Sequence, residues 1–400
     1  MKLRYNYRLY PADVQEVAFK QVSGNCRFVW NYFLTQNKIN YEFYKKFIFG
    51  FEMNNELPEL KKKYAWLKDT YSQVLQAKLK DLDLALKFKK YNRGFPKYKS
   101  KWNADNAFRY VQHTKITNNK CLRLPKIGDV KIRLHRDLPK YSSVTIYQNA
   151  GKWYASFVVE ITELPKIDIT TSIGIDVNAN NITDSNRNIH IAPRPNRKYK
   201  KKLKHLQRLV SRKKNKSKNK SKAMARLKRF TAHIRNIRKD FLHQTSARIT
   251  KTAHLISAET LDIDQMKRTN HLVAVAIQDN GWASLFGLIR YKTQLLGHHF
   301  HQINKWLASS KTCHTCGNKK DTLDLSTRVY VCNSVDCDWI CDRDINAALN
   351  IDTWGRQELR LKSGPERAKV LLDVMFDTLS SDGISSTQMK EEVTCFLDTW

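Results

Sequence analysis

Long apolar runs are missing from this sequence of 400 residues. A transmembrane helix needs about 20 consecutive apolar residues, and a secretory signal peptide needs an uninterrupted apolar core. Residues 1–10 instead alternate charged and apolar side chains, a pattern typical of a β-strand. The sequence therefore predicts an intracellular protein without a membrane segment, whose cysteines bind metal as thiolates rather than form disulfides.

Acidic residues are scarce in this chain. Lys and Arg number 72 against 37 Asp and Glu, which leaves a net charge of +35 and predicts a polyanionic partner. The basic residues are spread along nearly the whole chain, which favours a channel for nucleic-acid phosphates over a membrane-binding patch. The alternative is a solvated basic surface. The hydrophobic content of 41% is that of a globular protein, and the length suggests two or three domains.

Cysteines are few, but half of them are clustered, at Cys313, Cys316, Cys332 and Cys337. Two residues separate the first pair and four separate the second, so the four thiolates could close tetrahedrally on one zinc ion. The alternatives are a disulfide or free core cysteines, and His314 and Cys341 could substitute for a ligand. We call residues 308–341 the knuckle.

The first half of the chain changes from helical to strand periodicity. After the strand at residues 1–10, Asp13 is expected to cap a helix with Val14 and Val17 on one face, and helices continue to about residue 86. The aromatic block around Arg27 either stacks on bases or, as aromatic stripes more often do, forms core. Residues 73–90 form an amphipathic helix with lysines opposite its apolar face. Alternation then predicts antiparallel strands at residues 108–112, 120–124, 130–134, 143–148 and 153–160.

The second half alternates short apolar strands with helices. Strands are expected at residues 172–177, 188–191, 254–261 and 298–306, and a helix at residues 283–296. Two basic helices span residues 197–249. The lysine-rich segment that joins them, residues 214–222, is expected to be a flexible linker, whereas the helices themselves are expected to face nucleic acid.

Three of these segments each contribute one acid to an otherwise apolar setting: Asp176, Glu259 and Asp344. Buried carboxylates need a compensating cation, and two Mg²⁺ ions about 4 Å apart would catalyse phosphodiester hydrolysis. Asp262 and Asp264 compete with Glu259, and Asp344 could be an ordinary helix cap. The sequence contains neither a phosphate-binding glycine loop nor a Ser-His-Asp arrangement, so an ATPase is unsupported.

Several motifs resemble those of the TnpB family of transposon-encoded, RNA-guided DNA nucleases, relatives of the compact type V CRISPR effectors. They are Tyr-Arg-Leu-Tyr-Pro at 7–11, Cys-Arg-Phe-Val-Trp-Asn-Tyr-Phe-Leu at 26–34, Gly-Ile-Asp at 174–176, Ser-Lys-Thr-Cys-His-Thr-Cys-Gly at 310–317 and Asp-Arg-Asp-Ile-Asn-Ala-Ala-Leu-Asn-Ile at 342–351. The resemblance extends to about residue 352. The residues next to two of the acids differ from the usual family pattern. After Asp176, Asn178 replaces a glycine, and around Glu259 the sequence Ala-Glu-Thr-Leu replaces Glu-Asp-Leu or Glu-Asn-Leu.

The resemblance implies a multi-domain α/β architecture. Residues 168–355 would form a RuvC-like nuclease domain of ribonuclease H fold, with a basic helical hairpin inserted at 196–250 and a zinc ribbon at 308–341. Residues 1–12 and 96–165 would form a small wedge-like β-barrel domain, and residues 13–95 a helical recognition domain inserted into it. Residues 356–400 would be a weakly ordered tail.

The same resemblance implies the activity and its partners. Asp176, Glu259 and Asp344, with Asp342 as the alternative in the last motif, would hold two Mg²⁺ ions, beside one structural Zn²⁺. The partners would be a guide RNA and target double-stranded DNA, bound by a protein monomer in a prokaryotic, nucleoid-associated cytoplasmic setting. Candidate nucleic-acid contacts are Arg27, Tyr71, Gln73, Gln76, Lys78, Lys97, Lys99 and Arg212. Alternatives are a guided DNA-binding regulator with a silent nuclease, a compact type V CRISPR effector, and a strand-joining transposase that needs no RNA.

Overall fold

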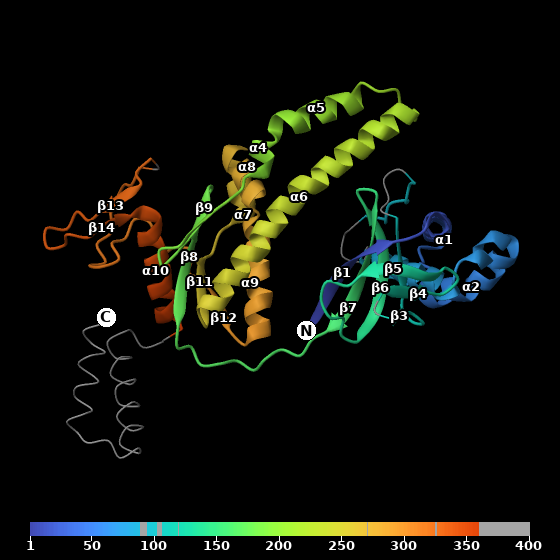
Figure 1. Ribbon diagram of the computed structural model, residues 1–400, viewed down its shortest axis with the longest axis horizontal. Coiled ribbons are helices and arrows are strands. Elements are labelled where there is room, and N and C mark those ends of the chain that lie inside the picture. Colours follow the sequence, from blue (N-terminus) through green and yellow to red (C-terminus); the bar gives the residue numbers. More distant parts are fainter. Residues whose placement is uncertain (89–93, 102–105, 119, 270, 325, 360–400) are drawn as a thin grey trace, which may run out of the picture. The chain divides into compact units, whose positions relative to one another are not determined.

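A computed structural model describes residues 1–88, 94–101, 106–118, 120–269, 271–324 and 326–359 (Figure 1). The chain divides into two compact units, one made of Met1–Thr162 and Lys201–His233, the other of Glu163–Lys200 and Ile234–Trp400. Within the described ranges, no helix is long and apolar enough to cross a membrane. Most of the tail expected at residues 356–400 lies outside these ranges.

The first unit contains a seven-stranded antiparallel sheet in the order β2-β6-β7-β1-β5-β4-β3. Its strands are β1 (Lys2–Tyr10), β2 (Ala107–Tyr110), β3 (Lys115–Thr117), β4 (Cys121–Leu124), β5 (Gly128–Arg133), β6 (Tyr141–Asn149) and β7 (Lys152–Glu160). The strand at the N-terminus joins the two halves, because β1 pairs with β7 over most of its length and with β5 at its end. All predicted strands are present, and β3 is additional. The expected small barrel is, in the described residues, a sheet whose ends are β2 and β3.

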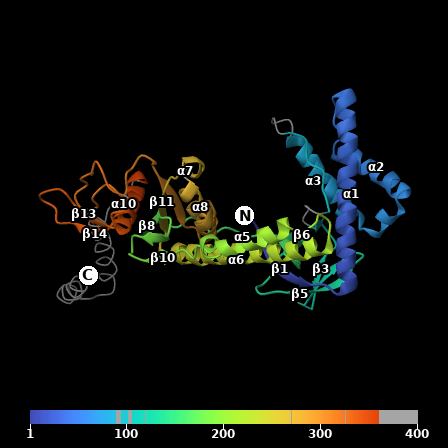
Figure 2. The ribbon, with the colours of Figure 1, turned by 90° about the horizontal axis from the view of Figure 1, so that it is seen from above.

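The first unit also contains three helices and a 3-10 turn: α1 (Asp13–Tyr44), α2 (Gly50–Lys63), η1 (Ala65–Asp69) and α3 (Ser72–Lys87). Helices α1 and α3 contact β2, and α2 packs against α3 and η1. Figure 2 shows α2 and α3 alongside α1. Helices and sheet share one apolar core, in which the Phe19 ring lies 4.9 Å from that of Trp153. The aromatic block of α1 is therefore mostly core, as its helical spacing indicated.

The start of α1 differs from the prediction. Ala12, not Asp13, is the N-cap, and its backbone N donates to the Gln15 side chain at 3.1 Å. Val14 and Val17 are exposed, whereas Phe19 and Val22 are buried. The predicted cap was wrong by one residue. The Gln15 side chain in the first turn accepts a hydrogen bond from the N-cap backbone, so the N-cap position does not need a short polar side chain.

The second unit contains a five-stranded sheet in the order β10-β9-β8-β11-β12. Its strands are β8 (Ser172–Val177), β9 (Asn181–Asp184), β10 (Ile189–Ile191), β11 (Leu255–Glu259) and β12 (His299–Ile303); a separate pair is formed by β13 (Val329–Val331) and β14 (Ile340–Asp342). β8, β11 and β12 run parallel, whereas β9 and β10 return antiparallel. Only β9 of the sheet strands was not predicted.

The remaining helices are α4 (Pro195–Lys198), α5 (Lys200–Ser211), α6 (Lys218–Thr252), α7 (Ile263–Thr269), α8 (His271–Asn280), α9 (Trp282–Leu296) and α10 (Arg343–Glu358). The two predicted basic helices are α5 and α6. The expected linker at residues 214–222 is shorter than predicted, because α6 already begins at Lys218. Lysine has a high helix propensity, so a lysine-rich stretch next to a helix readily extends it.

The two faces of β8 contact different partners. Ile173, Ile175 and Val177 point to one face and join a core with side chains of α6 and α9. Gly174 points to the other face, where a Cβ would lie 2.1 Å from the carbonyl oxygen of Ala348 on α10. Helix α10 therefore packs directly on the strand backbone, which requires glycine at position 174.

Candidate active site and metal centre

Asp176 and Glu259 lie on neighbouring parallel strands. Ile175 of β8 pairs with Ala258 of β11, so each acid follows a paired residue by one position. Side chains alternate along a strand, which turns both acids to the face covered by α10. Two carboxylates 83 positions apart in the sequence (259 − 176) thus come side by side at the carboxyl ends of β8 and β11.

Asp344 reaches the same place from the first turn of α10. Its side chain is mostly buried, and the residue is 8% exposed, as is Asp176. The helix is capped by Asp342, whose Oδ1 accepts hydrogen bonds from the backbone N of Asp344 at 2.9 Å and of Ile345 at 3.2 Å. The cap predicted for Asp344 therefore belongs to Asp342. We call Asp176, Glu259 and Asp344 the acid cluster.

Glu259 and Asp344 lie close enough to Asp176 to repel its charge. Burial, together with repulsion from Glu259 and Asp344, raises the pKa of Asp176 to about 8. Burial also raises the pKa of Glu259. Asp344 forms an ion pair with Arg343, whose Nη2 lies 3.7 Å from Asp344 Oδ1. Buried carboxylates that repel one another suit a divalent cation with a preference for oxygen ligands, and Mg²⁺ fits this donor set.

Two neutral side chains hydrogen-bond to the acid cluster. Asn178 Nδ2 donates to Asp176 Oδ2 at 2.7 Å, and the Ser309 hydroxyl donates to Glu259 Oε1. Sequence analysis noticed Asn178 but missed Ser309, which precedes the first cysteine pair of the knuckle. The only signal for Ser309 in the sequence was its place beside the family-like motif at 310–317.

The competing acids have other roles. Asp262 Oδ1 accepts a hydrogen bond from the backbone N of Gln265 at 2.9 Å, at the start of α7. Asp264 lies in the first turn of the same helix. Neither is among the groups that shift the pKa of Asp176.

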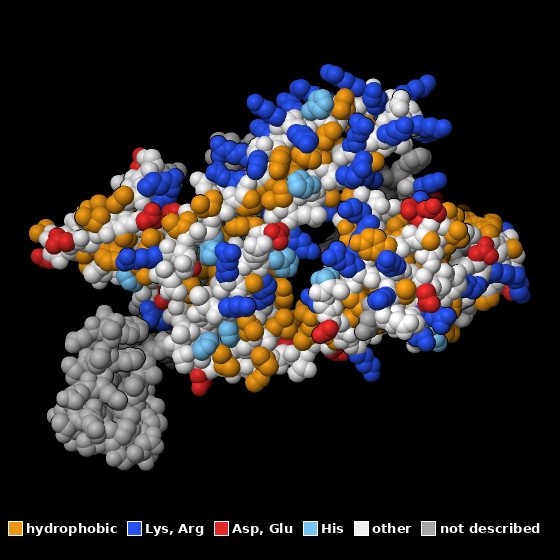
Figure 3. Space-filling model, viewed as in Figure 1, with side chains coloured by type: hydrophobic (Ala, Val, Ile, Leu, Met, Phe, Trp, Pro, Cys, Tyr) orange, Lys and Arg blue, Asp and Glu red, His pale blue; other side chains and the backbone are white. Residues whose placement is uncertain are grey.

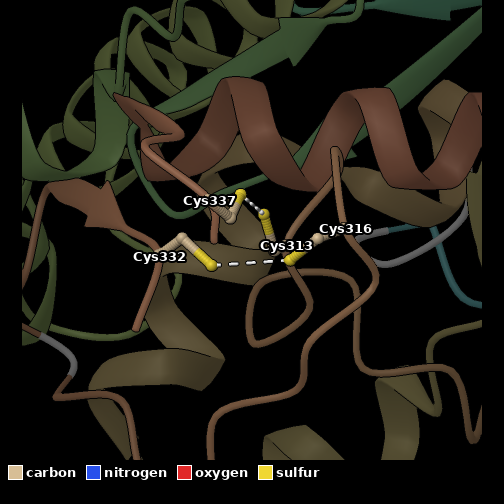
Figure 4. Close-up of side chains that lie close together, drawn as sticks. All are labelled: Cys313, Cys316, Cys332 and Cys337. Carbon is tan, nitrogen blue, oxygen red and sulfur yellow. Dashed lines mark hydrogen bonds between the residues drawn. The ribbon is translucent and has the colours of Figure 1, made fainter. Parts of the chain in front are cut away.

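The four predicted cysteines come together in the knuckle (Figure 4). Their Sγ atoms all lie within 4.8 Å of one another, and Cys313–Cys337 and Cys316–Cys332 are 3.8 and 3.6 Å apart. A hydrogen bond from the backbone N of Ser334 lowers the pKa of the Cys332 thiol to about 7, whereas the pKa values of Cys313 and Cys337 in the same group are raised, so of these three only Cys332 favours the thiolate. Four sulfurs at this spacing fit a tetrahedral Zn²⁺ site. His314 and Cys341 are not part of this group.

Basic side chains gather along α5 and the first half of α6 (Figure 3). No acidic residue occurs between Asp184 and Asp240. The candidate Arg212, just after α5, is exposed. Because this stretch has basic residues and no acidic residue of its own, it carries a large excess of positive charge.

The candidates on α3 are placed differently from one another. Gln76 is exposed, whereas Gln73 Nε2 donates to Gln112 Oε1 at 3.1 Å and the Tyr71 ring stacks on Tyr110. Lys78 is only 12% exposed at its side chain, where its Nζ lies 3.1 Å from Asp81. The lysine face predicted for this helix is thus partly turned inward at Lys78.

The carboxylate of Asp81 also binds Arg109, a residue that the sequence did not single out. Arg109 of β2 donates to Asp81 Oδ1 at 2.6 Å. Lys99 lies nearby, with Nζ 3.8 Å from the centroid of the Trp30 ring, and burial followed by the charge of Lys78 lowers its pKa to about 8. Arg27 donates to Asn106 at 3.1 Å, and Lys97 is exposed.

Comparison with known proteins connects these features to a family. A family model described as "Probable transposase" matches residues 156–270, one described as "Cas12f1-like, TNB domain" matches residues 282–351, and a "Helix-turn-helix domain" matches residues 1–46. A Streptomyces pristinaespiralis protein named "Putative RNA-guided DNA endonuclease" is 31% identical over 88% of this chain and 89% of its own length. The chain belongs to the TnpB family. InsQ of Escherichia coli K12, which has the same description, is 30% identical over 87% of this chain and 90% of its own length.

The fold of this TnpB chain is also found among solved structures. In the cryo-EM structure of a Cas12f1-sgRNA-target DNA complex, one chain aligns with a TM-score of 0.52 at 16% identity, covering 85% of this chain and 82% of that one. At this identity the likeness shows a shared α/β fold alone. The stretch matched as a helix-turn-helix domain consists here of β1 and the 32-residue helix α1.

Proposed function

We propose that this TnpB-family protein is an RNA-guided DNA endonuclease of a mobile element, which cuts guide-matched DNA beside a short adjacent motif. The relatives that resemble most of its length are named for that activity. The observation that supports it best is the acid cluster, since three acids from β8, β11 and α10 converge on one buried place.

The proposed architecture follows the family. Residues 168–355 would be the RuvC-like nuclease domain, with the hairpin at 196–250 and the zinc ribbon at 308–341. Residues 1–12 and 96–165 would be the wedge-like domain and residues 13–95 the recognition domain. In support, two acids of the cluster lie on parallel strands and the third on the helix that covers them, and the first unit combines one sheet with three helices.

Asp176, Glu259 and Asp344 would hold two Mg²⁺ ions, and the four cysteines one Zn²⁺. Bound Mg²⁺ would supply charge stabilisation for the attacking and leaving oxygens of a phosphodiester. The chain's own contribution would be to shield the acids from water and to orient Glu259, because the Ser309 hydroxyl donates to one of its carboxylate oxygens. The zinc site would be structural.

Guide RNA and target double-stranded DNA would be the partners. Base pairing to the guide would supply sequence specificity, while backbone contacts from lysines and arginines supply affinity. Exposed Arg212, Lys97 and Gln76 are accessible for such contacts. Binding should weaken strongly with added salt, because phosphate contacts release counterions.

The proposal is tested with protein purified together with its RNA. Matched double-stranded DNA is supplied with Mg²⁺, and the wild type is compared with Asp176→Ala. We expect the variant to bind guide and target normally but not to cut. Equal cutting by both proteins would remove Asp176 from the mechanism. Cutting that survives ribonuclease treatment would favour a transposase that needs no RNA.

One contact favours a second candidate, a guided DNA-binding regulator whose nuclease is silent. Asn178 already occupies Asp176 Oδ2 with a hydrogen bond of 2.7 Å, at the position where the family usually has glycine. A metal ion would compete with that bond. Guide-loaded protein that occupies matched DNA yet leaves it intact across a range of Mg²⁺ and Mn²⁺ would establish this function instead. The sequence flanking the gene, with transposon ends or a repeat array, would separate a mobile element from a CRISPR effector.

A further inference from the structure

Two buried asparagines of α10 face the knuckle. Asn346 and Asn350 are 0% and 4% exposed, and they lie one helical turn apart on the same side of the helix. Both donate through Nδ2 to the carbonyl oxygen of Thr312, each at 2.7 Å. Thr312 directly precedes the first cysteine of the metal centre, so both amides hold the backbone beside Cys313.

Asn346 joins the two halves of the knuckle. Its Oδ1 accepts from the backbone N of His314 at 3.1 Å and from Trp339 Nε1 at 3.0 Å. His314 follows Cys313, and Trp339 follows Cys337 by two positions. The single amide therefore contacts the segments that supply the first and the last cysteine, and it lies on α10 two residues after Asp344.

Asn350 continues this network toward the other acid. Its Nδ2 also donates to the carbonyl oxygen of Ser309 at 2.8 Å, and the Ser309 hydroxyl donates to Glu259. Ser309 is itself buried. The neighbouring residue Thr260 donates to the carbonyl oxygen of Ile303 at 2.6 Å, which attaches the end of β12 to the same corner. A continuous set of hydrogen bonds thus joins the knuckle to Glu259 as well as to the helix of Asp344.

We propose that Asn346, Asn350 and Ser309 are positioning residues that couple the four-cysteine metal centre to the acid cluster. A metal ion bound by the four cysteines would make the backbone around Cys313 rigid. The two asparagines and Ser309 would then hold Asp344 and Glu259 in the geometry that binds a divalent cation. Simple packing of α10 would be served as well by apolar side chains, since burying an amide costs free energy unless its hydrogen bonds are made. The inference rests on the proposed function for the role of the acids, but not for the coupling itself.

The coupling has a measurable size. Outer-shell partners of metal ligands typically alter metal affinity by about 10- to 100-fold when they are removed. Coupling between two binding sites is reciprocal. Zinc in the knuckle should therefore raise the affinity of the acids for a divalent cation by the same factor by which that cation raises the affinity of the knuckle for zinc. Removing the Ser309 hydroxyl should weaken cation binding at the acid cluster by about 10-fold or more.

The test uses the full chain and Mn²⁺ as the probe. Free Mn²⁺ is measured by electron paramagnetic resonance in titrations of wild type, Ser309→Ala, Ser309→Thr and Asn350→Asp, and zinc content and melting temperature are measured on the same samples. Asn350→Asp keeps the size of the side chain and removes both donated hydrogen bonds. The matched control is Asn333→Ala, an exposed asparagine of the knuckle whose side chain accepts only from Asn318 among the described residues. Cleavage of matched DNA is assayed in parallel.

We expect Ser309→Ala to keep its zinc and its melting temperature while binding Mn²⁺ about 10- to 100-fold more weakly. Ser309→Thr, which retains a hydroxyl, should restore most of the affinity, and wild-type protein stripped of zinc should resemble Asn350→Asp. The proposal is overturned if Ser309→Ala binds Mn²⁺ within twofold of wild type, or if Asn333→Ala is weakened equally. If wild type leaves matched DNA uncut, the endonuclease proposal fails, whereas the Mn²⁺ titration still decides the coupling.

Discussion

Asp176 and Glu259 each follow, by one residue, the paired positions Ile175 and Ala258 on adjacent parallel strands. Both side chains are therefore on one face of the sheet, about one strand spacing apart (~4.8 Å between backbones). The same alternation that buries Ile175 and Ala258 in the core behind the sheet turns the acids toward α10. A shift of either strand by one residue would exchange acid for apolar side chain and abolish the site.

Removal of one acid of the cluster should abolish cutting without affecting guide binding. We expect Glu259→Gln to reduce the cleavage rate by more than about 100-fold, since loss of an outer-shell partner alone costs about 10- to 100-fold. Asp262→Asn is the matched control, because Asp262 caps α7 instead. Single-turnover cleavage with guide-loaded protein checks both, and equal losses in the two variants would contradict the assignment.

Loss of the Asn178 side chain should make cutting easier. The hydrogen bond from Asn178 to Asp176 must be exchanged for a metal contact, and bonds to charged groups contribute about 1.5–3 kcal/mol. We expect Asn178→Ala to lower the Mg²⁺ concentration for half-maximal cleavage by about tenfold or more. Asn180→Ala, an exposed neighbour, should leave it unchanged. A higher Mg²⁺ requirement in Asn178→Ala would show instead that Asn178 orients Asp176.

A methyl group at position 174 should displace α10. The added Cβ would lie 2.1 Å from the oxygen of Ala348 and 2.4 Å from the nitrogen of Asp352, both backbone atoms that cannot rotate away. Gly174→Ala should lower the free energy of unfolding by about 1–3 kcal/mol or more. Gly287→Ala, at a helical glycine with open space around it, should be neutral or stabilising by roughly 0.5–1 kcal/mol. Urea denaturation compares the two, and a stable Gly174→Ala protein would refute the close packing.

Zinc content should distinguish the cysteines. Cys332→Ser is expected to lose the bound zinc and to melt at a lower temperature, because three thiolates bind Zn²⁺ more weakly than four. Cys341→Ser should keep one zinc per chain, since the Cys341 thiol donates to the Asp342 carbonyl oxygen outside the group. Elemental analysis by mass spectrometry checks the stoichiometry. A zinc loss confined to Cys341→Ser would assign the ligands differently.

Lys99 should make the free energy of unfolding depend on pH in the alkaline range. Burial lowers its pKa to about 8 in the folded protein, whereas in the unfolded chain the pKa returns to its ordinary value of about 10.5. Between these values the unfolded chain binds more protons, so the free energy of unfolding should rise with pH from about 8 to 10.5. Lys99→Met should remove that rise, whereas Lys97→Met at an exposed site should retain it. Identical pH profiles for wild type and Lys99→Met would contradict the shift.

Much of the secondary structure was predictable because it depends on short-range periodicity. Short apolar runs predicted β8 and β11, and helical spacing predicted the buried face of α3, since both patterns depend on near neighbours in the chain. The cysteine spacing likewise predicted which four thiols come together in the knuckle. Short elements were missed: β3 and β9 are three and four residues long, and α7 has seven residues, most of them polar. Helix α8 was missed although it is largely apolar.

The sequence by itself determined which acids and thiols the chain could use, because their chemistry belongs to the side chains and their spacing to the motifs. Only the tertiary structure decided that Asp342 caps α10 while Asp344 faces Asp176, and that Lys78 turns inward to Asp81. It also revealed Ser309, Asn346 and Asn350, which make hydrogen bonds to partners 32 to 50 residues distant in addition to the nearer contact of Asn346 with Trp339. Such contacts depend on how strands and helices pack across the chain, which no local pattern encodes.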